Sequence, residues 1–191
     1  MSEERRTALA DAAIRTLAEL GMRGLTHRAV DRTAGLPPGT TSAYFRTRAA
    51  LLTALVRRLV ARDQAELQAA GERLPLPRTA AELTDCFAEL ARARLSGEGR
   101  LRSLARYACA LESVRDPELR EILAPHENAG RQGVRAFLTA HGAPDPDGRT
   151  DTLLACVDGL VLNHLLAGTP VPRESLEGLV AAALRPGAGG P

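Results

Sequence analysis

The chain has 191 residues, of which 45% are hydrophobic and 3% aromatic, so it can form one or two compact domains and is neither disordered nor collagen-like. Alanine and leucine supply most of the apolar residues, which favours helices over strands, and we expect an all-α protein. Residues 1–63 hold 11 arginines against 6 acidic residues, whereas residues 64–191 hold 14 against 17, so the basic surplus lies in the first third of the chain.

The first predicted helix runs from Arg5 to Leu20, because its apolar residues recur with the period of a helix. Gly21 follows and can adopt the left-handed conformation that ends a helix. Thr26 is a candidate N-cap for a second, short helix over residues 27–34, which Gly35 ends.

A third helix is predicted directly after a turn. Residues 36–39, Leu-Pro-Pro-Gly, cannot continue a helix, and residues 40–45 have room for only one or two helical turns. Two short helices around a glycine-containing turn form a candidate helix-turn-helix motif.

The remaining residues predict a longer helical segment without internal repeats. A kink or break is expected near Ala124, because Pro125 interrupts the helical pattern there. The predicted elements are a connecting helix from Thr47 to about Ala70, helices around residues 83–91 and 101–111, a helix from Pro117 to Leu138 broken near Ala124, a loop at 142–148, and helices at 150–166 and 176–184.

Residues 34–52, Ala-Gly-Leu-Pro-Pro-Gly-Thr-Thr-Ser-Ala-Tyr-Phe-Arg-Thr-Arg-Ala-Ala-Leu-Leu, resemble the DNA-binding signature of TetR-family transcriptional repressors. The resemblance covers residues 5–56, and the rest of the chain is similar only in its helical layout. Two residues depart from the family pattern: Asp31 stands where a small apolar residue is usual, and Ser42 where tyrosine is frequent.

The resemblance implies an N-terminal three-helix DNA-binding domain over residues 1–48 and a C-terminal helical ligand-binding and dimerisation bundle over residues 49–185. Residues 186–191 are expected to form a disordered tail. A short helix on a compact three-helix unit can enter the major groove, where hydroxyl groups and methyl groups contact base edges and arginines contact phosphates. The expected DNA-binding residues are Thr26, Arg28, Thr40, Thr41, Ser42, Tyr44, Arg46 and Arg48. Taken singly, Thr26 could be only a helix cap and the arginines only solvated.

The C-terminal segment has no catalytic motif and no spacing of metal ligands, so we expect neither an enzyme nor a metal or cofactor. A partly polar pocket between helices is the alternative to a purely structural role for its polar and aromatic residues. For the two aromatic residues, packing in the core is the competing interpretation. The candidate ligand-binding residues are Phe87, Tyr107, Glu112, His126, Asn163 and His164.

The segment from Thr150 to Leu166 carries more apolar side chains than one side of a small bundle can cover, which indicates a homodimer. Ala155 and Gly159 would allow close approach of a partner helix, and the last helix would complete a symmetric interface. A monomer that buries these residues internally is the alternative. The expected interface residues are Leu153, Val157, Leu162, Leu166, Leu176, Leu179 and Val180.

Three cysteines, Cys86, Cys109 and Cys156, lie far apart within apolar helical patterns, which is typical of buried, reduced thiols in a cytoplasmic protein. The N-terminus has no apolar segment of a signal peptide, and polar residues interrupt the apolar stretch 153–166, so we expect neither secretion nor a membrane partner.

The expected function is a homodimeric repressor that binds a palindromic operator on double-stranded DNA and is released by a small hydrophobic or amphipathic effector. A thiol-based redox regulator of the same fold is the first alternative. An all-α small-molecule-binding protein is the second.

Overall fold

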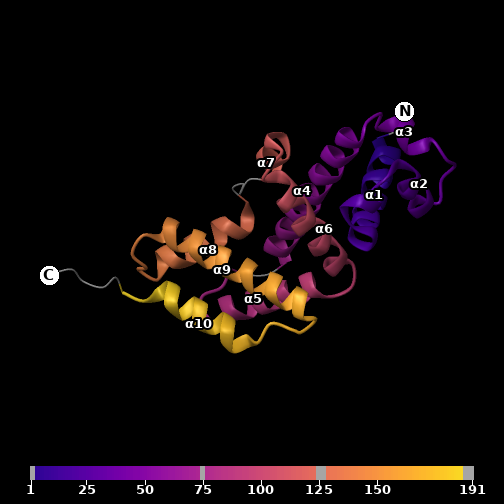
Figure 1. The fold of residues 1–191 in the computed structure, drawn as a ribbon. Coiled ribbons are helices and arrows are strands. Elements are labelled where there is room, and N and C mark those ends of the chain that lie inside the picture. The colour runs from indigo at the N-terminus through magenta and orange to yellow at the C-terminus, as the bar shows by residue number, and fades with distance from the viewer. Residues whose placement is uncertain (1–2, 74–75, 124–127, 187–191) are drawn as a thin grey trace. The chain divides into compact units, whose positions relative to one another are not determined.

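The computed structural model describes residues 3–73, 76–123 and 128–186, and within these ranges it contains ten helices and no strand. The expected all-α fold is confirmed. Figure 1 shows the helices in chain order, which are α1 (Glu3–Gly24), α2 (His27–Ala34), α3 (Thr40–Tyr44), α4 (Arg48–Arg73), α5 (Ala80–Leu95), α6 (Gly97–Ser113), α7 (Pro117–Leu123), α8 (Ala129–Ala140), α9 (Pro146–Ala167) and α10 (Arg173–Leu184).

The helices form two compact units. Unit 1 comprises the described residues of Met1–Ala65 and Glu98–His126, and unit 2 those of Glu66–Gly97 and Glu127–Pro191. The units therefore divide the chain within α4 rather than at residue 48, and α6 and α7 belong with the N-terminal helices. The functional division into residues 1–48 and 49–185 stays a prediction, and residues 187–191 of the expected tail lie outside the described residues.

Helix boundaries in unit 1 follow the local signals of the sequence. The Thr26 hydroxyl accepts a hydrogen bond from the Ala29 amide at 3.2 Å, which caps the N-terminus of α2 as predicted. Gly35 then ends α2 with a left-handed φ of 65°. Gly21 has a φ of 69° and interrupts the helical geometry of α1 where the first helix was expected to end.

Unit 1 has one apolar core, to which Leu17, Val30 and Phe45 contribute with exposures of 2% or less. Side chains from α1, α2 and α4 form this core together with Phe45, the residue directly after α3, while α6 and α7 add side chains from the second half of the unit. The buried members are Leu9, Ala12, Ala13, Ile14, Leu17, Leu25, Val30, Phe45, Leu51, Leu55, Val56, Leu59, Ala105, Cys109 and Leu119.

Ion pairs tie helices of unit 1 together at the edge of this core. Asp11 on α1 accepts two hydrogen bonds from Arg58 on α4, each 2.9 Å long, and Arg62 lies 3.3 Å from the same carboxylate. Asp63 on α4 pairs with Arg106 on α6. The paired side chains are only 21–32% exposed, so solvent screens them less than it screens a fully exposed pair.

The core of unit 2 is built by α5, α8, α9 and α10, each of which contributes one apolar face. Phe137 on α8 also stacks on His141 with a ring-centroid distance of 4.1 Å. The buried members of this core are Leu83, Phe87, Val134, Phe137, Leu138, Ala143, Leu153, Val157, Leu176 and Val180.

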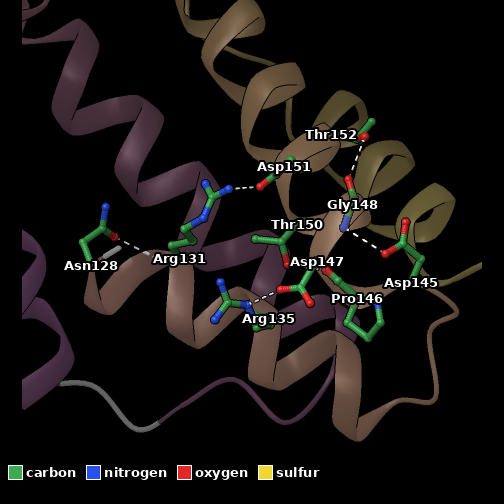
Figure 2. A network of polar contacts seen from close by, with 10 residues as sticks. All are labelled: Asn128, Arg131, Arg135, Asp145, Pro146, Asp147, Gly148, Thr150, Asp151 and Thr152. Atoms are coloured by element: carbon green, nitrogen blue, oxygen red, sulfur yellow. Dashed lines mark hydrogen bonds and ion pairs between the residues drawn. The ribbon is translucent and has the colours of Figure 1, made fainter. Parts of the chain in front are cut away.

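Polar contacts join α8 to the first turns of α9 (Figure 2). Arg131 pairs with Asp151, and Nε of Arg135 lies 2.7 Å from the Asp147 carboxylate. Asp145 accepts a hydrogen bond from the Gly148 amide at 3.2 Å and is the N-cap of α9. The predicted loop over 142–148 is therefore too long, because this cap and a proline in the first turn start the helix at residue 146.

Among the described helices, α9 alone has the length and apolar composition that would suffice to cross a membrane. The same composition is found in core helices of compact domains, and one helix of this kind is weak evidence for a membrane span. In the structure Leu153 and Val157 of α9 belong to the core of unit 2, and Val161 and Leu165 are buried as well.

The prediction that all three cysteines are buried is wrong for two of them. Cys109 is fully buried in unit 1, but Cys86 and Cys156 are exposed. Each exposed cysteine directly precedes an inward-facing residue, Phe87 or Val157, and one residue turns a helix by about 100°. Their apolar surroundings in the sequence therefore did not reveal which side of the helix they occupy.

Burial of Cys109 should make the free energy of unfolding fall at alkaline pH. Burial raises the pKa of its thiol from 9.0 to about 12, an effect that the nearby Arg106 charge opposes and Glu112 reinforces. The unfolded thiol ionises above its ordinary pKa while the folded thiol stays protonated, so this contribution is complete below pH 9 and is lost as the pH rises towards 12. Between pH 8 and 10 the free energy of unfolding should fall by about 1.4 kcal/mol more in the wild type than in Cys109→Ala.

Urea unfolding of both proteins at several pH values measures this difference. Cys156→Ala is the matched control, because its thiol is exposed, and it should keep the pH dependence of the wild type. Equal pH dependence in the wild type and Cys109→Ala would contradict the assignment.

Candidate nucleic-acid interface

The turn between α2 and α3 is compact and depends on two glycines. Gly35 and Gly39 have φ values of 65° and 92°, a region that residues with a Cβ rarely adopt. The Leu36 amide donates to the Asp31 carbonyl at 2.9 Å, and the Thr40 amide donates to the Pro37 carbonyl at 3.2 Å. This geometry places the five-residue helix α3 directly after the turn, as a helix-turn-helix requires.

Asp31 lies on α2, is only 2% exposed, and binds the first turn of α3. Its carboxylate accepts hydrogen bonds from the Gly39 amide at 2.8 Å, the Thr41 amide at 2.7 Å and the Thr41 hydroxyl at 2.5 Å. Burial by itself would raise the pKa of Asp31, but these hydrogen bonds and the nearby His27 outweigh burial and hold the pKa below its ordinary value. The carboxylate is therefore charged at neutral pH.

The other end of α3 is held as well. Nε2 of His27 lies 2.7 Å from the carbonyl oxygen of Phe45, the residue that follows the last helical residue Tyr44. The guanidinium of Arg6 on α1 lies over the Phe45 ring, 5.0 Å from its centroid. Contacts from α1 and α2 thus converge on the end of α3.

Most of the expected DNA-binding residues lie on the surface of unit 1. Ser42 on α3 is exposed, as are Thr26 and Arg28 at the start of α2 and Arg46 after α3. Thr40 and Tyr44 are half-buried. Polar side chains are therefore exposed or half-buried along the short helix, and exposed arginines precede and follow it in the chain.

Thr41 does not fit the surface role that the sequence suggested. It is fully buried, and its hydroxyl and amide both donate to Asp31. Arg48 is exposed, but its guanidinium donates to the carbonyls of Leu25 at 2.6 Å and Met22 at 2.7 Å. Thr41 is therefore part of the interior, and Arg48 holds the chain that joins α1 to α2.

In the sequence, Asp31 stood out only as a departure from the family pattern, and no role was predicted for His27. A signal was present, because the two residues are four positions apart and so lie on one face of α2. Asp31 also directly follows the buried Val30 on an eight-residue helix. The partners could not be identified from the sequence, since they depend on how the turn folds back.

The candidate ligand-binding residues are divided between the two units. Tyr107 and Glu112 are half-buried on α6 in unit 1. Phe87 belongs to the core of unit 2, which is the structural role considered for it. On α9, Asn163 is exposed, and Nδ1 of His164 lies 2.8 Å from the Thr169 hydroxyl. His126 lies outside the described residues.

Unit 1 also has two open grooves along α4. One is lined by Arg57, Val60, Ala61, Gln64, Glu118, Glu121 and Ile122, and the other lies between α1, the end of α3 and α4. Tyr107 and Glu112 line neither groove. The role of these two residues in ligand binding stays a prediction.

Four of the seven expected interface residues lie in the core of unit 2 and are removed from the predicted dimer surface. Leu153, Val157, Leu176 and Val180 are at most 2% exposed, so no partner chain can reach them. Leu166 is 77% exposed, and Leu162 and Leu179 are half-buried. The outward face of α9 also carries Ala155 and Gly159, which are exposed and half-buried, respectively.

Comparison with known proteins gives consistent matches along the chain. The family model of the tetracyclin repressor-like C-terminal domain matches residues 78–186. The HTH-type transcriptional regulator BetI of Rhizobium meliloti (strain 1021) is 30% identical over 179 residues, which are 92% of this chain and 85% of BetI.

Solved structures agree with these matches. A TetR-family member from Streptomyces coelicolor A3 is 32% identical, with a TM-score of 0.70 over 95% of this chain and 99% of that chain. The multidrug binding protein EbrR in complex with ethidium is 32% identical, with a TM-score of 0.69 over the same shares of the two chains. Other structures of EbrR contain imidazole, proflavin or malachite green.

Proposed function

The chain belongs to the TetR family of transcriptional regulators, and we propose that it is a repressor that binds a palindromic operator as a homodimer. A small apolar or amphipathic effector releases it from DNA. In this proposal the protein regulates transcription by binding DNA and effector without catalysing a reaction, and it does so in the cytoplasm. The observation that carries this proposal is the helix-turn-helix of unit 1, whose second helix carries hydroxyl and phenol groups and is followed directly by Phe45 and the exposed Arg46.

The side chains of this surface are suited to DNA. Ser42 is exposed at the middle of α3, and its hydroxyl can exchange its contact with the Gly39 carbonyl for a base edge or a phosphate oxygen. Thr40 and Tyr44 lie two residues before and after it on the same short helix. Arg28 and Arg46 supply phosphate contacts that fix the orientation of the helix in the groove.

The outward face of α9 supports the proposed dimer. Leu166 is exposed on the same face of α9 that carries the small residues Ala155 and Gly159, a combination that lets a second helix approach closely. Leu162 on α9 and Leu179 on α10 are half-buried and are the other proposed interface residues. A symmetric dimer places two copies of α3 at a fixed separation, which must match half-sites about 34 Å or a multiple of it apart.

The effector is proposed to contact α6, where Tyr107 and Glu112 are half-buried. The similarity to EbrR, whose structures contain ethidium and malachite green, supports an amphipathic organic compound. Such a compound releases DNA only if it binds one arrangement of the dimer more tightly than the other. Helix α4 contributes residues to both units and is the proposed transmitter.

Selective DNA binding is the most direct expectation of the proposed function. The protein should shift a DNA fragment that precedes its own gene at a lower concentration than a random fragment of equal length. Thr40→Ala and Tyr44→Ala should each weaken this binding by about tenfold, because each removes a side chain that is proposed to contact the major groove of DNA. Mobility-shift titration at fixed salt measures the affinities.

Arg100→Ala is a matched control for DNA binding, because it removes an exposed side chain of unit 1 outside α1–α3. Its affinity should stay within about twofold of the wild type. Equal binding of both fragments by the wild type, with no effect of Thr40→Ala or Tyr44→Ala, would refute the proposal.

A charged substitution on α9 tests the proposed dimer surface. Leu166→Glu should convert the dimer into a monomer at micromolar concentration, because a charge in an apolar interface is costly to bury, and it should abolish selective DNA binding. Leu111→Glu replaces a residue of unit 1 that is 70% exposed and should leave the mass unchanged. Sedimentation equilibrium measures the mass, and a monomeric wild type would contradict the proposal.

Effector release is tested with compounds of known structure. Ethidium, proflavin and malachite green are each added to the complex of the protein with its upstream DNA, and at least one should lower the affinity for DNA. Tyr107→Ala and Glu112→Ala should reduce that response, whereas Glu174→Ala, at an exposed residue of α10 that lines neither groove of unit 1, should not. A response that both α6 variants retain in full would show that the effector binds elsewhere.

A further inference from the structure

Helix α3 lacks a cap of its own. Its N-cap residue is Gly39, which has no side chain to accept a hydrogen bond from the first amides of the helix. Asp31 supplies the missing acceptor from α2, because its carboxylate binds the Gly39 amide and the amide and hydroxyl of Thr41. An N-cap side chain normally accepts from the second or third helical residue, and Thr41 is the second residue of α3.

The same face of α2 also binds the C-terminal end of α3. His27 lies four residues before Asp31, and its Nε2 donates to the Phe45 carbonyl at 2.7 Å. That carbonyl belongs to the residue that ends α3. One face of α2 therefore holds α3 at both ends, and the charge of Asp31 lies where the partial positive charge of the helix N-terminus stabilises it.

We propose that Asp31 and His27 are positioning residues for DNA binding. Together they form a clamp that holds α3 in the orientation that presents Ser42 and Tyr44 to the major groove of DNA. This inference rests on the proposed DNA-binding function. Neither residue needs to touch DNA, since the Asp31 carboxylate is buried and already accepts three hydrogen bonds from α3 and its cap.

The clamp contributes to affinity because a helix of five residues does not stay folded by its own hydrogen bonds. If α3 is ordered before binding, DNA does not have to supply the free energy of ordering it. The clamp also affects what can be recognised, because it keeps Thr41 in the interior. Among the polar residues of α3, only Thr40, Ser42 and Tyr44 remain at the surface.

The test combines DNA affinity with hydrogen exchange of single amides in the full chain. Asp31→Asn keeps the shape of the side chain but removes its charge and one acceptor oxygen. We expect the affinity for the fragment upstream of its own gene to fall by about tenfold or more. The Gly39 and Thr41 amides should exchange faster in this variant while the amides of α1 stay protected.

Variants of Thr41 grade the effect, because they alter one of the three hydrogen bonds. Thr41→Ser keeps the hydroxyl and should bind DNA within about twofold of the wild type, whereas Thr41→Val loses it and should bind about fivefold more weakly. His27→Ala releases the other end of α3 and should also weaken binding by about fivefold.

Thr16→Val is the matched control for a merely structural effect. Thr16 is fully buried in the same unit, and its hydroxyl donates to the Ala12 carbonyl and lies 2.9 Å from the Thr33 hydroxyl, but neither partner belongs to α3. Thr16→Val should lower the free energy of unfolding, as Thr41→Val does, but keep the DNA affinity of the wild type.

The outcomes separate this inference from the proposed function. A wild type that does not select its upstream fragment refutes DNA regulation, and amide exchange then still decides whether the clamp exists. A wild type that binds selectively, together with an Asp31→Asn variant of unchanged affinity, overturns the positioning role. The same conclusion follows if Thr16→Val weakens DNA binding as much as Asp31→Asn.

Discussion

The structure of unit 1 depends on one constraint: α3 has only five residues, and a helix of that length is not stable in water. Its order comes from neighbouring elements. Phe45 is buried in the apolar core next to its end, while Asp31 on α2 accepts hydrogen bonds from its first turn. A buried carboxylate would be costly if it were unpaired, so the fold and the charge of Asp31 stabilise each other.

Because α3 depends on its neighbours, the contacts that hold those neighbouring helices together also matter. The Asp11 carboxylate joins α1 to α4, and Arg48 binds carbonyls at the end of α1. These contacts keep the helices that carry α2 and α3 in one arrangement. A rigid support suits a surface whose side chains must match the fixed pattern of a DNA groove.

A different constraint acts on unit 2, because α9 is apolar on several faces and its own chain covers only some of them. Its inward face, with Leu153 and Val157, completes the core of its own chain. Its outward face leaves Leu166 exposed beside small residues, and such a face is stabilised when a second chain covers it. The same helix can therefore stabilise the unit and present a surface to a partner.

The sequence predicted those features that depend on local chemistry. Thr26 and Gly35 bound α2 as expected, because capping and left-handed glycine involve only nearby residues. It did not predict the faces of α9, since a helix that is apolar nearly all round has no periodicity that tells inside from outside. Thr41 was misplaced for a related reason: its partner Asp31 is ten residues away, and only the folded turn brings them together.

Hydrogen exchange of the chain with and without the DNA fragment upstream of its own gene tests the central claim most directly. The account predicts that DNA slows exchange at α2, α3 and the following residues up to Arg48, with the strongest protection at Ser42 and Tyr44. DNA binding that leaves these amides unchanged and instead protects helices of unit 2 would contradict it.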